Sequence, residues 1–109
     1  MAQTKSCKGA ALSLLGRQPY TTRRLWDKLA QKGYPDGEVE ETIGWCVEEG
    51  YLNDGEWALR AAARKAGKGW DAYRIKAYLR YYGIGREDID DALEALARMG
   101  DTDEDGDGE

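Results

Sequence analysis

A 50-residue repeat occurs twice in this chain and constrains its fold more than any other feature. The matched positions comprise helix-start residues, apolar residues at helical spacing and glycines where helices are expected to end. They are Tyr20, Thr21, Leu25, Leu29, Gly33, Tyr34, Val39, Ile43 and Gly50 in the first copy, and Trp70, Asp71, Ile75, Leu79, Gly83, Ile84, Ile89, Leu93 and Gly100 in the second. A fixed period indicates a repeat architecture. Such proteins more often present a surface to a partner than enclose a catalytic pocket.

The spacing of apolar residues predicts three helices in each copy. In the first copy we expect them over about 7–17, 21–33 and 35–50, with Cys46 and Val47 among the inward residues of the third. In the second copy we expect one from Asn53, then 71–82 and 86–99. No segment alternates with period 2, so strands are not expected. The predicted fold is all-α, with two tandem three-helix repeats packed into a short curved helical array.

The predicted organisation has three parts. Residues 1–52 form the first three-helix repeat, 53–100 form the second, and 101–109 form a disordered acidic tail without apolar residues. No apolar run approaches the length of a membrane span, and the N-terminus lacks the apolar core of a signal peptide. We therefore expect a cytoplasmic protein with no membrane partner.

The formal net charge of −5 hides a pattern along the chain. Six of the 21 acidic residues lie in the last nine positions, and without them 16 basic residues face 15 acidic ones. Residues 1–35 carry seven Lys or Arg and one acid, whereas 36–56 carry eight acids and no base. The second copy follows the same order, with eight bases and one acid in 57–86 and five acids and one Arg in 87–100. Each copy opens basic and closes acidic, which indicates a polarised surface.

The predicted helix over 71–82 combines basic and aromatic residues. With Ile75 and Leu79 directed to the core, two stripes remain at the surface. They consist of Arg74, Tyr78 and Tyr81 beside the buried face, and Lys76 and Arg80 on the far side; Arg24 and Lys28 are the first copy's counterparts of Arg74 and Tyr78. Such a surface suits a phosphate backbone, stacked bases or an acidic protein. A solvated helix whose tyrosines pack on neighbouring repeats explains the same residues equally well.

The repeat also sorts the tryptophans. Trp57 and Trp70 occupy periodic core positions, so we expect them to pack rather than to recognise a ligand. Trp26 corresponds to Lys76 on an outward-leaning face, and is the tryptophan to consider for recognition.

No residue pattern points to an enzyme, a metal or a cofactor. The chain has no histidine, and its two cysteines, Cys7 and Cys46, lack metal-ligand spacing. Cys46 is expected to be a small buried hydrophobe. The segment Asp101-x-Asp103-x-Asp105-Gly106 opens like a calcium-binding loop, but no glutamate follows at the twelfth position, and a solvated acidic tail explains it. We therefore expect no catalytic residues, no bound metal and no cofactor.

Four fragments, taken in order, resemble a known family. They are Ala11-Leu12-x-Leu14-Leu15, then Tyr20-Thr21-x-x-x-Leu25-x-x-Lys28-Leu29-x-x-Lys32-Gly33-Tyr34, then Gly50-Tyr51-Leu52-Asn53-Asp54-x-x-Trp57-Ala58, and finally Lys68-Gly69-Trp70-x-x-x-Arg74-Ile75-x-x-x-Leu79-x-x-x-Gly83-Ile84. Over about residues 7–99 the sequence resembles the regulatory protein RecX family. Its members are tandem three-helix repeats that bind the recombinase RecA, lodge in the groove of its filament on single-stranded DNA, and suppress its ATPase, strand-exchange and coprotease activities.

The sequence departs from the family pattern at three points. Two repeats are visible where the family usually has three, which bears on the reach along a filament and hence on inhibitory strength. Arg24 stands where an acidic residue is common, and Asn53 and Gly55 interrupt a usually acidic run.

The resemblance implies a modulator, usually an inhibitor, of RecA. Its partners would be the RecA filament and, through the filament, single-stranded DNA, with no small-molecule substrate. From surface position we predict that the contacts are made by Arg23, Arg24, Lys28, Arg60, Arg64, Arg74, Lys76, Tyr78 and Arg80. Two alternatives stay open: a small helical DNA-binding module of helix-turn-helix type acting on duplex DNA, and an adaptor with no nucleic acid partner.

Overall fold

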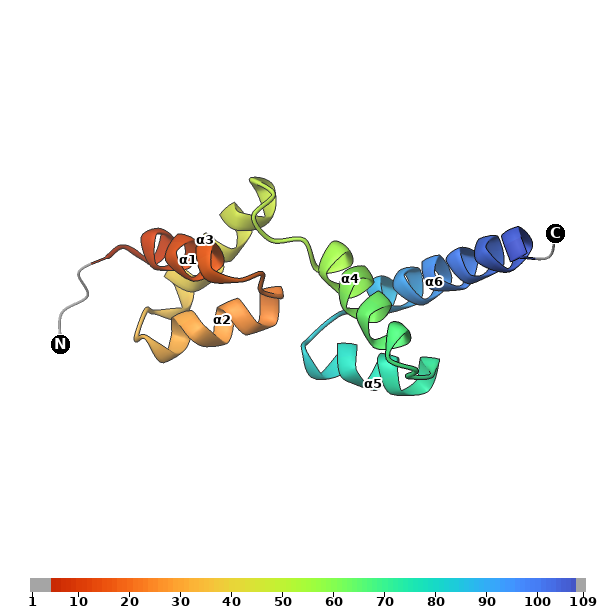
Figure 1. Cartoon of the computed structure of the whole chain (residues 1–109). Helices are drawn as coiled ribbons and strands as arrows, with labels where there is room; N and C mark the ends of the chain where they lie inside the picture. The colour runs from red at the N-terminus through yellow and green to blue at the C-terminus, as the bar shows by residue number, and fades with distance from the viewer. Residues whose placement is uncertain (1–4, 108–109) are drawn as a thin grey trace. The chain divides into compact units, whose positions relative to one another are not determined.

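The computed structural model describes residues 5–107, with side chains as far as Met99. Its helices are α1 (Cys7–Arg17), α2 (Thr22–Gln31), α3 (Asp36–Glu48), α4 (Asp54–Gly67), α5 (Ala72–Tyr81) and α6 (Arg86–Asp107), as labelled in Figure 1. No strand occurs among residues 5–107. The chain divides between Asn53 and Asp54 into two compact units, unit 1 with α1–α3 and unit 2 with α4–α6. The prediction of an all-α fold with two tandem three-helix repeats is confirmed.

Matched residues begin the middle helix of each unit. Thr21 is the N-cap of α2, and its hydroxyl oxygen accepts a hydrogen bond from the amide of Arg24 at 3.1 Å. Asp71 caps α5 in the same way, and its carboxylate accepts from the amide of Arg74 at 2.8 Å. The first amides of a helix lack a partner within the helix, and an N-cap side chain supplies one. The repeat therefore preserves a hydrogen-bonding role although the residue type changes.

Matched glycines end the same helices. Gly33 and Gly83 have φ angles of 97° and 84°, in the left-handed region that glycine adopts without steric cost. The reversal turns the following amide back toward the helix, so that the amide of Ile84 donates to the carbonyl oxygen of Leu79 at 3.1 Å. The corresponding bond in unit 1 measures 3.4 Å. This pairing satisfies a carbonyl that the helix end would otherwise leave without a donor.

Each unit has its own hydrophobic core. Leu25 and Leu29 of α2 are fully buried, as is Leu79 of α5, and Ile75 is 2% exposed, so the apolar positions matched by the repeat are core positions. The buried core of unit 1 consists of Cys7, Ala10, Ala11, Leu25, Leu29, Tyr34, Val39, Ile43, Cys46 and Leu52. That of unit 2 consists of Ala58, Ala61, Ala62, Ile75, Leu79, Ile84, Ile89 and Ala92.

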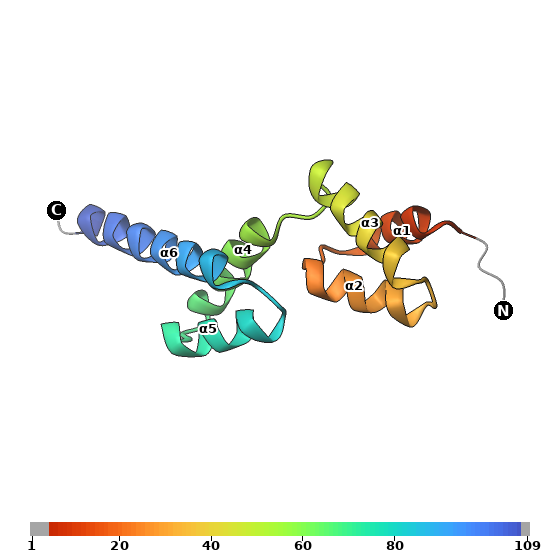
Figure 2. The same cartoon turned by 180° about the vertical axis from the view of Figure 1, so that it is seen from behind.

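Small side chains set the packing of α4 in unit 2. Ala58, Ala61 and Ala62 are buried on one face of this helix. Because an alanine side chain is short, such a face lets a neighbouring helix approach closely. Figures 1 and 2, which view the chain from opposite sides, both show α4 against the first part of α6, in agreement with the contacts between these helices.

Three features differ from the expectations. Val47 is 51% exposed because Val39, Ile43 and Cys46 already complete the buried stripe of α3 and Val47 lies at its margin. The unit boundary falls after Asn53, not after residue 52. Helix α6 continues to Asp107, whereas a disordered tail is expected from residue 101. Propagating an existing helix needs one backbone hydrogen bond per residue and no apolar contact, so α6 can extend through a polar segment. Residues 108–109 lie outside the described residues.

Candidate nucleic-acid interface

Four aromatic rings gather where α4, α5 and their connection meet in unit 2. Tyr78 of α5 lies at the centre, with its ring centroid 6.5 Å from Trp57, 5.8 Å from Trp70 and 4.9 Å from Tyr82. Trp57 and Tyr82 also contact each other, at 5.2 Å. These separations lie in the range that favours aromatic pairs. The rings therefore form a connected platform rather than isolated side chains.

Two cations rest on this platform. The Lys65 ammonium nitrogen lies 4.8 Å from the centroid of Trp70 and 4.6 Å from that of Tyr78. The Arg74 guanidinium carbon lies 4.2 Å from the Trp70 centroid. Cations within about 6 Å of a ring centroid are attracted by the ring's quadrupole. A carboxylate partner would cancel the charge, whereas a ring restrains the side chain and leaves it positive. We call these six residues the aromatic–cation cluster: Trp57, Lys65, Trp70, Arg74, Tyr78 and Tyr82.

The nine predicted contact residues fall on three helices. They are Arg23, Arg24 and Lys28 on α2, Arg60 and Arg64 on α4, and Arg74, Lys76, Tyr78 and Arg80 on α5. The structure brings Arg74 and Tyr78 together, because both contact Trp70. Arg23, Arg60, Arg64, Arg74 and Arg80 are exposed, and Arg24, Lys28, Lys76 and Tyr78 are half-buried.

Arg60 differs from the other predicted arginines of unit 2 in having an ion-pair partner. Its guanidinium lies 3.0 Å from the Glu56 carboxylate, one turn earlier on α4. Both side chains are more than half exposed, so the pair adds little stability. It does reduce the charge that Arg60 offers to an anionic partner, which makes Arg64 the stronger candidate on α4.

Two aromatic residues differ from their expected positions. Tyr78 is expected in a surface stripe, but it is half-buried at the centre of the cluster, because Trp57 and Trp70 cover it from α4 and from the connection. Its contact with a partner stays a prediction. Trp26, expected to lean outward, is partly buried against the unit 1 core. Trp57 and Trp70 pack against the unit 2 core, as predicted.

Lys65 and Tyr73 are among the residues of this surface that are absent from the predicted set. Lys65 reaches the cluster because Gly69, with a φ of 92°, turns the chain so that the Trp70 amide donates to the Lys65 carbonyl oxygen at 3.1 Å. A glycine four residues after a lysine and just before an aromatic residue is a usable sequence signal for this proximity. Tyr73 is 82% exposed, and its spacing of eight residues from Tyr81 places both on the outer side of α5.

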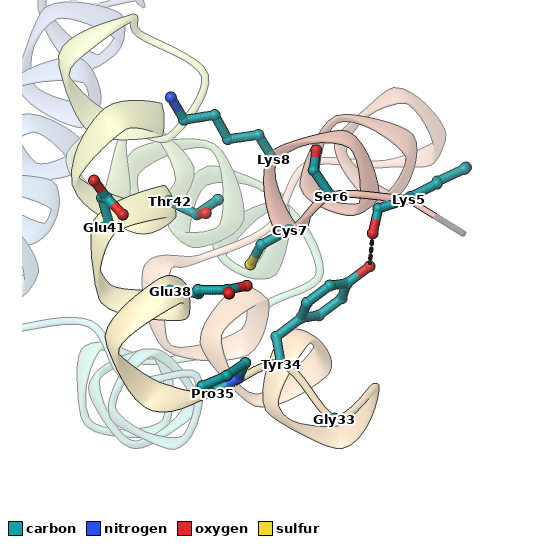
Figure 3. A pocket seen from close by; sticks show the side chains of 10 residues that line it. All are labelled: Lys5, Ser6, Cys7, Lys8, Gly33, Tyr34, Pro35, Glu38, Glu41 and Thr42. Carbon is teal, nitrogen blue, oxygen red and sulfur yellow. Dashed lines mark hydrogen bonds between the residues drawn. The ribbon is translucent and has the colours of Figure 1, made fainter. Parts of the chain in front are cut away.

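Unit 1 contains an open pocket of about 550 Å³ between the residues preceding α1 and the start of α3 (Figure 3). The Tyr34 hydroxyl donates a hydrogen bond to the carbonyl oxygen of Lys5 at 2.8 Å and joins the two walls. The walls carry charges of both signs, from Lys5 and Lys8 and from Glu38 and Glu41. Opposite charges of equal number give no preference for an anion. This pocket is therefore a weaker candidate for nucleic acid than the aromatic–cation cluster.

Both cysteines are buried. Cys46 is fully buried, as predicted, and Cys7 is 5% exposed. Burial raises the pKa of the Cys46 thiol, the nearby Cys7 raises this pKa further, and Lys8 opposes both effects. A raised pKa keeps Cys46 in its unreactive thiol form at neutral pH. In the described part of the chain no group of three or more acidic or sulfur side chains is placed to hold a metal ion.

Two similar three-helix units, with separate cores and a positively charged aromatic surface, define a tandem helical repeat protein that presents a surface. Residues 7–46 match the family description "RecX, first three-helix domain". The regulatory protein RecX of Trichlorobacter lovleyi is 37% identical over 101 residues, which cover 91% of this chain and 65% of that protein. The regulatory protein RecX of Vibrio campbellii is 34% identical over 92 residues, covering 84% and 59%. Over most of its length the chain is similar to regulatory proteins of the RecX family.

Solved structures show the same fold. A crystal structure of regulatory protein RecX is similar with a TM-score of 0.78 and 25% identity, over 83% of this chain and 45% of that chain. A crystal structure of RecX from Lactobacillus salivarius also has a TM-score of 0.78, at 24% identity, over 82% of this chain and 58% of that chain. The chain spans 59% to 65% of the lengths of the two curated relatives described above. No helix in the described range is long and apolar enough to cross a membrane.

Proposed function

We propose that the protein binds the filament that RecA forms on single-stranded DNA in the cytoplasm, and lowers its ATP hydrolysis without chemistry of its own. Similarity to RecX regulatory proteins supports the choice of RecA as the partner. The observation that carries the proposal is the aromatic–cation cluster, in which Lys65 and Arg74 rest on rings that leave their charges available. Fixed positive charge beside aromatic rings suits a nucleoprotein filament, whose surface includes phosphates.

Each unit carries a basic surface, so binding by one unit can strengthen binding by the other. Arg23, Arg24 and Lys28 lie on α2 of unit 1, and Arg74, Lys76 and Arg80 lie on α5 of unit 2. A filament repeats the same binding sites along its length. Once one unit is bound, the binding of the other becomes intramolecular, with an effective concentration that reaches the order of millimolar for short connections. Bridging neighbouring RecA subunits in this way would hold them in one arrangement and hinder the cycle that ATP hydrolysis requires.

DNA-dependent ATP hydrolysis by the host RecA tests the proposal directly. Protein at or below a one-to-one ratio with RecA is expected to lower the rate. An unchanged rate at severalfold excess of folded protein would contradict the proposal. Binding to naked duplex DNA with a steep salt dependence, together with an unchanged ATPase rate, would indicate the helix-turn-helix alternative instead.

A triple variant tests whether the interface lies on α5. Reversing the charge of Arg74, Lys76 and Arg80 to Glu is expected to weaken filament binding, because phosphates or acidic RecA residues then meet negative charge. The control carries the same charge change elsewhere, at Arg17, Lys32 and Arg86, all of which are exposed. Arg74 and Arg80 are exposed and Lys76 is half-buried. Surface substitutions usually change stability by within about 0.5 kcal/mol each, so both variants should stay folded, and circular dichroism checks this. Equal loss in both variants would show that net charge alone, and not α5, governs binding.

A further inference from the structure

The outer face of α5 carries two exposed tyrosines and two cations. We call this face the tyrosine stripe, and it consists of Tyr73, Lys76, Arg80 and Tyr81. Separations of three, seven and eight residues from Tyr73 place the other members on one side of a helix. The tyrosines are 82% and 74% exposed, while Ile75 and Leu79 on the opposite side are buried. The stripe is therefore distinct from the face that stabilises unit 2.

Folding of the three-helix unit does not require this stripe. The first repeat keeps the cap, the core leucines and the terminal glycine, but it has different residues at the stripe positions of α2: Arg23, Trp26, Ala30 and Gln31. A tyrosine that is about four-fifths exposed also removes little apolar surface from water, so it contributes little to stability. Rings that stay largely exposed are suited to recognition, because tyrosine supplies a large contact area with few rotatable bonds.

The ring of Tyr81 is held in place from behind. It meets Tyr82 edge-on, with centroids 5.1 Å apart. Tyr82 in turn lies 4.9 Å from Tyr78 and 5.2 Å from Trp57. A chain of ring contacts thus runs from the aromatic–cation cluster to the exposed ring. A side chain that is already restrained loses less conformational entropy when a ligand stacks on it.

We propose that the tyrosine stripe binds single-stranded nucleic acid directly, with bases stacked on Tyr73 and Tyr81 and phosphates contacting Lys76 and Arg80. Eight residues of α-helix span about 12 Å. Adjacent bases in a stacked strand are about 3.4 Å apart, so the tyrosines engage bases that are not neighbours, and the intervening backbone passes the two cations. A duplex hides its base faces, and an acidic protein has none, so the combination of rings and cations favours an unpaired strand. This inference deepens the proposed function and rests on it for the biological setting.

The test is fluorescence anisotropy of a labelled oligo-dT strand with the full chain and no RecA. The wild-type protein is expected to bind, and the double variant Tyr73→Ala/Tyr81→Ala is expected to bind more weakly. The loss of one stacked base corresponds to about 5- to 140-fold in affinity. The variant Tyr73→Phe/Tyr81→Phe keeps both rings and should retain most of the affinity. Tyr51→Ala is the matched control, since Tyr51 is 49% exposed in unit 1 and should not matter.

The alternatives give different results. Wild-type affinity in the double alanine variant, or equal binding of a duplex of the same length, would overturn the inference. Loss of filament binding in that variant, without any binding of oligo-dT by the wild-type protein, would assign the stripe to a protein partner and also overturn it. RecA ATPase activity, measured separately, distinguishes this failure from failure of the proposed function. A lowered ATPase rate without binding of oligo-dT contradicts only the inference, and binding without an ATPase effect contradicts only the function.

Discussion

Asp88 experiences opposing electrostatic effects in unit 2. It lies in the first turn of α6, where the helix dipole favours a carboxylate. Nevertheless, burial raises the pKa of Asp88 above its ordinary value of 3.8, and the carboxylates of Asp54, Asp91 and Glu87 raise it further. Loss of hydration and like-charge repulsion therefore outweigh the dipole. The charged form of Asp88 is less favourable in the folded protein than in the unfolded chain.

The sign of this shift predicts an unusual pH response. Because the folded state binds the proton of Asp88 more tightly than the unfolded state, stability from this group rises as the pH falls from neutral through the raised pKa. Asp88→Asn is therefore expected to stabilise unit 2 at neutral pH, and its advantage should vanish below the ordinary pKa of 3.8. Urea unfolding at several pH values measures this. Asp90→Asn, at an exposed position two residues later, is the control. A lower stability of Asp88→Asn at neutral pH would contradict the prediction.

The carboxylate cap of α5 gives a second prediction for a single residue. Asp71→Ala removes the acceptor of the Arg74 amide and should destabilise unit 2 by about 1 kcal/mol. Asp71→Asn keeps a side-chain oxygen at the cap and should lose much less. Chemical unfolding followed by circular dichroism compares the variants. Equal stability of the alanine variant and the wild-type protein would mean that water replaces the cap without loss.

Two glycines of unit 1, one within α3 and one just after it, have different backbone conformations and should respond oppositely to substitution. Gly50, just after the helix, has a φ of 83°, whereas Gly44 lies within it. A Cβ added at either position meets nothing within 4 Å, so only backbone conformation matters. Gly50→Ala should destabilise unit 1 by about 1–2 kcal/mol, because alanine is strained at positive φ. Gly44→Ala should stabilise it by about 0.5–1 kcal/mol, because alanine favours helix. Thermal or urea unfolding measures both, and a shift of the same sign in both variants would contradict the argument.

The sequence predicts the helices well because their signals are local. Thr21 and Asp71 mark helix starts and Gly33 and Gly83 mark helix ends through hydrogen bonds made within a few residues. It predicts the surface less well, because burial depends on what packs across the chain. The helical pattern predicts the direction in which Tyr78 points. It does not predict that Trp57 of α4 and Trp70 of the α4–α5 connection cover its ring.

Lys65 and α6 show the same limitation. The proximity of Lys65 to Trp70 and Tyr78 depends on a turn and on a neighbouring helix, and neither is visible in residue spacing along α4 alone. The extent of α6 is also missed, since its last turns lack the apolar residues on which the prediction relied. The contact residues can therefore be predicted only from the folded structure of each unit, and not from residue spacing alone.

Charge is distributed unevenly along the chain. We expect the acidic residues at its end to weaken binding to DNA or to the filament. Residues 101–109 contain six acids and no base. These negative charges repel the phosphates of a nucleic acid near this end of the chain. Deleting residues 101–109 is expected to strengthen binding to DNA or to the filament, most clearly at low salt, where screening is weak. Titrations with and without the segment at two ionic strengths measure this. Weaker binding of the truncated protein at low salt would show that the segment is a contact instead.

The division of the chain after Asn53 also affects the order in which the two units fold during synthesis. Every buried residue of the unit 1 core, from Cys7 to Leu52, precedes this division. Synthesis at about 5–20 residues per second takes several seconds for a second unit of this size, whereas helical units with local contacts fold in microseconds to milliseconds. Unit 1 can therefore complete its core before unit 2 has emerged from the ribosome, and two similar sequences avoid exchanging helices during synthesis. Protease resistance of ribosome-stalled chains measures this order. Unit 1 is expected to become resistant before unit 2 is complete. Resistance that appears only with the full chain would contradict this expectation.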